Sequence, residues 1–151
     1  TAYDISLGLV GSEMCIRDSY EATPDPKDHP IRGAKILVEK GYPEDVVYAI
    51  KSHATYLGLE RRSLMDKTLF AVDELVGFVT AVALVRPSGS VLEVKVRSVR
   101  KKMKAVAFAR SVSREDIVEG AESLKLELSD HIANVISAMQ EEAEALGLTG
   151  T

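Results

Sequence analysis

The chain has 151 residues, a formal net charge of −4 and 46% apolar residues, which indicates one globular domain and excludes a disordered chain. No apolar run is both long and free of charge. The nearest candidate, residues 71–85, contains Asp73 and Glu74, so no membrane span is predicted. A single cysteine, Cys15, excludes a disulfide within the chain and fits a reducing, cytoplasmic location.

The first nineteen residues differ from the rest of the sequence. LVGSEMCIRDS, at 9–19, has neither the alternation of a strand nor the apolar stripe of a surface helix. It resembles the translation of a transposon adapter that is used to prepare sequencing libraries. We therefore interpret residues 1–19 as a non-native tail. The native sequence is expected to begin near Tyr20, in a domain over 20–151 that is truncated at its N-terminus.

The first two predicted helices precede residue 54. Residues 31–40 have helical apolar spacing, and Gly41 is a good C-terminal stop. A second helix begins after Pro43 and carries His53 on the apolar face that Ile50 helps to define. The histidine is therefore expected to point toward the protein interior.

A long third helix is predicted over 64–85, with Ser63 as its N-cap. It is apolar nearly all round between 71 and 85, which predicts burial. Asp73 and Glu74 are the two charged residues of that stretch. They point about 100° apart, so one carboxylate can be buried while the other is exposed. A buried carboxylate needs a partner or a metal ion.

The remaining sequence predicts three further helices and no convincing strand pair. Residues 94–104 form a short basic helix, and Ser113 caps the next one. Ser129 or Asp130 is expected to cap the last helix, which should reach about residue 146. The fold class is therefore all-α.

Two inward histidines and an aspartate on separate helices would suit a divalent metal ion. His29, His53 and Asp73 are the candidates. From the residues alone, however, an inward histidine is more often an ordinary core residue with a satisfied hydrogen bond.

Three sequence motifs narrow these alternatives: HPIRGAKIL, VYAIKSHATYLG and TLFAVDEL. Together they resemble the later half of an HD-domain metal-dependent phosphohydrolase of the HDIG type, over about 20–140. The resemblance implies an HD-domain-like helical bundle, incomplete at its N-terminus. It also implies that His29, His53 and Asp73 bind a divalent metal (Mn, Fe, Co, Mg or Zn), with Asp73 catalytic. His131 matches no family position and is expected at the surface or at a helix start.

The chain departs from this family in one important respect, because it contains no His-Asp doublet. In the family the doublet lies shortly before a segment like SYEATPDP, so it would fall within the part that we expect to be lost. The doublet holds the metal and polarises its water. The resemblance therefore implies a hydrolase whose activity is absent or weak in this chain.

Charge is unevenly distributed along the sequence. Residues 86–110 hold eight basic side chains and one acidic one, whereas 115–144 hold nine acidic and one basic. Two solvated faces that attract each other would explain this pattern, and so would a segment that binds phosphate. The candidates for binding a substrate phosphate are Arg86, Lys95, Arg97 and Lys102.

Two classes of function remain open. The first is a phosphohydrolase that acts on a nucleotide or another small phosphate ester. The second is a non-catalytic helical domain that binds a protein partner or nucleic acid through its basic 86–110 segment. Phe108 is the only aromatic residue of that segment, so base stacking is poorly supported. We expect a small phosphorylated substrate rather than nucleic acid.

Overall fold

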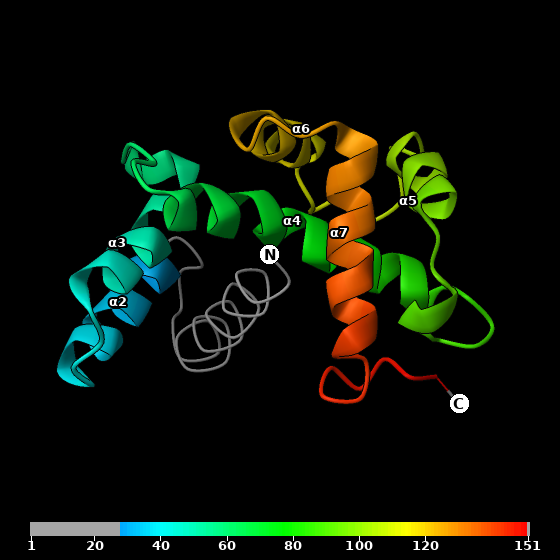
Figure 1. Cartoon of the computed structure of the whole chain (residues 1–151), viewed down its shortest axis with the longest axis horizontal. Helices are drawn as coiled ribbons and strands as arrows, with labels where there is room; N and C mark the ends of the chain where they lie inside the picture. Colours follow the sequence, from blue (N-terminus) through cyan, green and yellow to red (C-terminus); the bar gives the residue numbers. More distant parts are fainter. Residues whose placement is uncertain (1–27, 151) are drawn as a thin grey trace.

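The computed structural model describes residues 28–150, so the interpretation of residues 1–19 as a non-native tail lies outside the described residues. Within the described range the chain is helical and has no strand, which confirms the all-α fold class. The α-helices are α2 (His29–Glu39), α3 (Glu44–Ser52), α4 (Leu64–Leu84), α5 (Val96–Met103), α6 (Arg114–Ser123) and α7 (Leu128–Glu141) (Figure 1). Two 3₁₀ turns, η3 (Thr55–Leu57) and η4 (Val91–Glu93), lie in the connections.

Helix α4 is the element around which the others are arranged. Its 21 residues span about 30 Å. The start of α4 is fixed by a capping box, in which the Ser63 hydroxyl accepts from the Asp66 N–H at 3.1 Å and the Asp66 carboxylate accepts from the Ser63 N–H at 2.9 Å. In Figure 1 the α2–α3 hairpin lies at one end of α4, and α5, α6 and α7 surround the rest of it. The capped end of α4 is therefore the end nearest the hairpin.

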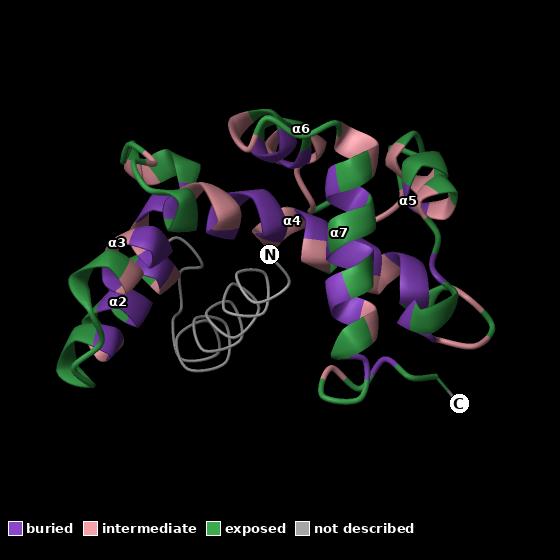
Figure 2. Ribbon diagram, in the orientation of Figure 1, coloured by how far each residue is buried: buried purple, intermediate pink, exposed green. Residues whose placement is uncertain are grey.

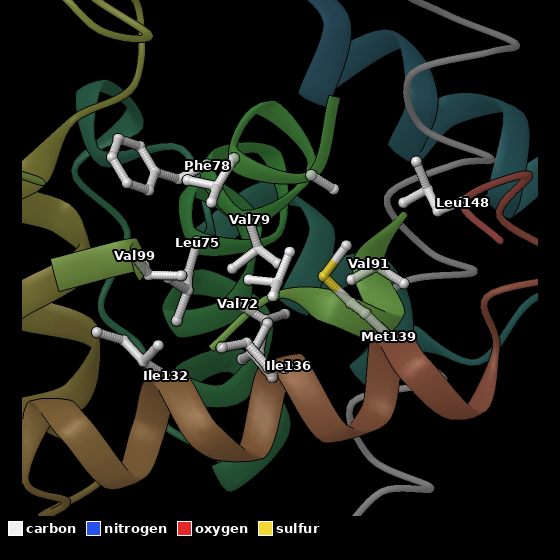
Figure 3. Close-up of a cluster of buried hydrophobic side chains, with 14 of the residues drawn as sticks. Val72, Leu75, Phe78, Val79, Val91, Val99, Ile132, Ile136, Met139 and Leu148 are labelled. Atoms are coloured by element: carbon white, nitrogen blue, oxygen red, sulfur yellow. The ribbon is translucent and has the colours of Figure 1, made fainter. Parts of the chain in front are cut away.

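Most of the buried apolar side chains within residues 28–150 belong to one of two separate groups. The small core joins α2 and α3 to the first half of α4 through Ala34, Leu37, Val47, Ala49, Ile50 and Leu69. The large core lies between the second half of α4 and η4, α5, α6 and α7, and Phe78, Leu75, Ile132 and Met139 are among its fully buried members. Figure 2 shows the buried faces of α2 and α3 turned toward each other, and Figure 3 shows the large core. Each outer helix is buried on one side only, which explains why its apolar residues recur at helical spacing in the sequence.

Helices α4 and α6 approach each other closely at Gly120. A Cβ atom added to this glycine would lie 2.6 Å from the Cα atom of Ala71, a distance that van der Waals repulsion forbids. The lack of a side chain at Gly120 therefore allows the two backbones to pack against each other.

The last helix differs from the prediction at both ends. It begins after Glu127 rather than after Ser129 or Asp130, and it ends at Glu141 rather than near 146. The chain then turns back, and the Leu148 N–H donates to the Ala143 carbonyl at 2.8 Å. Both of these side chains are buried in the large core. Apolar residues near 146 thus pack as a turn, which periodicity alone cannot distinguish from a further helical turn.

The membrane prediction concerns α4, the longest helix. Within residues 28–150 no helix combines the length and the apolar character needed to cross a membrane.

Candidate functional site

Two of the three predicted metal ligands lie side by side. His29 is the first residue of α2, and His53 directly follows the last residue of α3. Gly41, with a φ of +77°, reverses the chain between these helices, so the start of α2 comes next to the end of α3. The centroids of the two imidazole rings are 5.4 Å apart, and the ring planes are tilted by 56°. Both histidines are half-buried.

The hydrogen bond of His53 fixes the position of its proton. Its Nδ1 atom lies 2.5 Å from the carbonyl oxygen of Ile50. A carbonyl oxygen can only accept, so Nδ1 carries the proton and Nε2 of the neutral ring retains a lone pair. Metal-binding histidines are commonly oriented by a bond of this kind to a backbone carbonyl. In this tautomer, the lone pair on Nε2 of His53 can bind a metal ion.

Asp73 lies on α4 at the junction of the two cores. It follows Leu69 by one helical turn, so it shares the face of α4 that packs against the hairpin. Its side chain is half-buried, and within residues 28–150 its carboxylate has no hydrogen bond or ion pair. No group of three or more His, Cys, Asp or Glu side chains in this range could hold a metal ion. The described residues therefore supply a histidine pair and do not bring Asp73 into a three-ligand site with it.

The neighbouring carboxylate, Glu74, has a structural role. Its Oε2 atom accepts from the backbone N–H of Ser113 at 3.1 Å, and Ser113 is the N-cap of α6. Burial raises the pKa of the Glu74 carboxyl above its ordinary value of 4.5, although the bond from Ser113 opposes this rise. Asp73 is thus the carboxylate of this pair that remains for ligand binding.

His131 is buried, so the expected surface position is wrong. Its side chain is 2% exposed, and its Nε2 atom lies 2.8 Å from the carbonyl oxygen of Ala71. The histidine lies in the first turns of α7, as a helix-start residue would, but it points into the interface with α4. Burial lowers the pKa of His131 below its ordinary value of 6.5. The neutral imidazole therefore stabilises the contact between α7 and α4.

Among the four predicted phosphate-binding residues, Arg86 follows the end of α4, Lys95 is the N-cap of α5, and Arg97 and Lys102 belong to α5. Figure 1 shows α5 toward the other end of α4 from the α2–α3 hairpin. The Arg86 guanidinium lies 3.5 Å from the Glu93 carboxylate. The Lys102 ammonium lies 4.5 Å from the centroid of the Phe108 ring. Neither contact leaves the cation fully available to a ligand.

The other two predicted cations are exposed. Lys95 is the N-cap residue of α5, and Arg97 lines a surface hollow on the same helix. The hollow has a volume of about 660 Å³ and is also lined by Val96, Arg100, Lys101 and Lys104. The prediction does not include the last three residues, although they follow Arg97 at i+3, i+4 and i+7, a spacing that indicates a common helical face. This basic hollow and the histidine pair are separate features.

Comparison with known proteins gives no match. No protein-family model, no curated protein and no solved structure is significantly similar to this chain. The resemblance to HD-domain phosphohydrolases therefore rests on the sequence motifs, and the geometry of His29 and His53 is an independent observation.

Proposed function

We propose that this chain is an HD-type metal-dependent phosphohydrolase that acts on a nucleotide or another small phosphate ester, with weak activity in the form described. The observation that carries the proposal is the proximity of His29 and His53, with ring centroids 5.4 Å apart. The motif HPIRGAKIL contains the first histidine and VYAIKSHATYLG contains the second. Residues 24 positions apart in the sequence thus come together at the place where the family resemblance expects metal ligands.

The residues that the structure describes provide part of a metal-binding site. His53 would bind it through Nε2, because Nδ1 donates to Ile50. His29 would provide a second imidazole. The resemblance assigns the carboxylate to Asp73, although residues 28–150 do not bring it into a three-ligand site with the two histidines. When bound, a divalent metal in such a site lowers the pKa of a coordinated water and stabilises negative charge on the phosphoryl oxygens. The absence of a His-Asp doublet from the sequence is the reason to expect weak binding and slow turnover.

Cobalt binding tests this proposal, because visible absorption reports on the ligands of Co²⁺. We expect the wild-type chain to bind Co²⁺, and we expect His53→Ala or His29→Ala to weaken binding by at least about tenfold. Asp73→Asn tests the role that the resemblance assigns to Asp73, and it should weaken binding if this carboxylate joins the histidine pair in the metal-bound protein. The matched control is His131→Gln, which changes the third histidine and should leave Co²⁺ affinity unchanged.

Hydrolysis of p-nitrophenyl phosphate and of a nucleotide panel with Mn²⁺, Fe²⁺ or Co²⁺ provides the second readout. We expect slow turnover that requires the metal and is lost in His53→Ala. Co²⁺ binding that persists in both His29→Ala and His53→Ala would refute the proposed metal site. Loss of binding in the histidine variants but not in Asp73→Asn would limit the site to the histidine pair.

A further inference from the structure

The solvent face of α5 carries four cations at helical spacing. They follow one another at i, i+3, i+4 and i+7, which places them on one side of the helix. These residues, here called the cationic stripe, are Arg97, Arg100, Lys101 and Lys104. All four are exposed. From its first to its last residue the stripe extends about 10 Å, which is the rise of about three nucleotides along one strand of a duplex.

The positive charge of the stripe is not neutralised by the protein. Within residues 28–150 the ion pairs join Arg61 to Glu119 and Arg86 to Glu93, and neither involves the stripe. The Arg100 guanidinium donates to the Ser129 hydroxyl at 2.5 Å. That bond orients the side chain, but the hydroxyl is neutral, so the charge of Arg100 remains available to an anion.

The stripe is held on a fixed backbone. Away from the stripe, Val99 is fully buried in the large core and Met103 packs against that core, whereas Val96 packs against the core and also borders the hollow. The helix therefore cannot rotate without exposing apolar surface. Preorganised cations lose less conformational freedom on binding than cations on a mobile segment do.

We infer that the cationic stripe binds the phosphate backbone of nucleic acid without reading its sequence. A small anion is a poor match, because ligand sites for small molecules usually enclose most of the ligand, and a single exposed ion pair contributes little. A polyanion contacts several cations at once and releases its condensed counterions, so the contributions accumulate. No aromatic residue lines the hollow, so the structure provides backbone contacts without base stacking.

This inference does not depend on the proposed metal site, since the stripe and the histidine pair lie toward opposite ends of α4 (Figure 1). The proposed binding cannot come from the net charge of the chain, because that charge is −4 and would repel nucleic acid. Any attraction of nucleic acid must therefore come from a local surface.

Fluorescence anisotropy with a labelled DNA duplex of mixed sequence, and with oligothymidylate, tests the inference on the full chain. Four phosphate contacts predict that the logarithm of the binding constant falls with the logarithm of salt concentration with a slope of about −3.6 for the duplex and about −2.8 for the single strand. The variant Arg97→Gln/Lys101→Gln/Lys104→Gln should bind at least tenfold more weakly and reduce the slope to about −1. Arg97→Lys should retain binding, because it preserves the charge.

The control variant Lys35→Gln/Lys51→Gln/Lys67→Gln removes the same charge from α2, α3 and α4, and it should keep both affinity and slope. Equal loss of binding in the control would overturn the inference, as would an absence of binding by the wild-type chain at low salt. Circular dichroism establishes that each variant is folded. The alternative partner is a second copy of this chain, and sedimentation measures its association. The inference would also be overturned if the chain self-associates in a salt-sensitive way, the stripe variant loses this association, and neither oligonucleotide binds.

Discussion

Within residues 28–150, six buried apolar side chains hold the α2–α3 hairpin against α4, whereas sixteen form the large core around the second half of the same helix. The histidine pair belongs to the region with the smaller core among the described residues, and Asp73 lies where the two regions meet. Regions with few buried contacts open at a lower free energy than the global unfolding free energy. The relative positions of the candidate ligands therefore depend on the weaker of the two cores.

Truncation of one side chain in each core gives the largest expected effect and tests whether the regions differ. Phe78→Ala, in the large core, should lower the free energy of unfolding by about 3–5 kcal/mol. Ile50→Ala, in the small core, should reduce the hydrogen-exchange protection of α2 and α3 while that of α7 stays near its wild-type value. Equal loss of protection in α7 would mean that the two regions unfold as one unit.

The glycine contact between α4 and α6 gives the next largest effect. Gly120→Ala should destabilise the protein by about 1–3 kcal/mol, because its Cβ would clash with the Ala71 backbone. The control is Gly77→Ala on the exposed side of α4, where a Cβ would have no atom within 4 Å. That change should stabilise the protein by about 0.5–1 kcal/mol, because alanine favours the helix. Urea denaturation measures both changes, and a stable Gly120→Ala variant would contradict the close approach.

The smallest expected effect concerns His131, which links α7 to the middle of α4. Because its folded-state pKa is lowered below 6.5, the unfolded chain binds a proton at a higher pH than the folded chain does. The free energy of unfolding should therefore fall as the pH decreases below about 6.5. His131→Gln keeps a side-chain N–H donor for the Ala71 carbonyl and removes the titration. At neutral pH it should remain within about 1 kcal/mol of the wild type.

Urea denaturation of the His131→Gln variant over a range of pH checks this prediction. The variant should lose less stability on acidification than the wild type. Parallel pH profiles would show that protonation of His131 does not weaken the large core.

Much of the helical fold could be predicted from local sequence signals. Gly41, Ser63 and Ser113 mark helix ends through backbone conformation and capping, which depend on neighbouring residues. The end of α7 differs from the prediction because the residues near 146 owe their burial to a turn that packs on the large core. Tertiary packing of this kind has no signature in the apolar spacing.

The candidate site was predictable to a smaller extent. The motifs identified His29 and His53, and the hairpin between them explains their proximity. The burial of His131 depends on α4 and α7, which are 60 residues apart at the contact with Ala71, so its local sequence could not indicate it. Lys95 and Arg97 are predicted to bind the substrate phosphate because they are basic, but they belong to α5 and its N-cap, toward the other end of α4 from the α2–α3 hairpin (Figure 1). Distances across a fold are set by the packing of its helices, which charge composition does not report.

The central place of α4 also has a consequence for biosynthesis. The ribosome adds about 5–20 residues per second, and α7 is completed at Glu141, 57 residues after α4 ends at Leu84. The apolar surface of α4 therefore stays without its final cover for roughly 3–11 seconds on the nascent chain. During that interval a chaperone that recognises exposed apolar helices would find its binding site on α4, and the arrival of α7 would end that exposure.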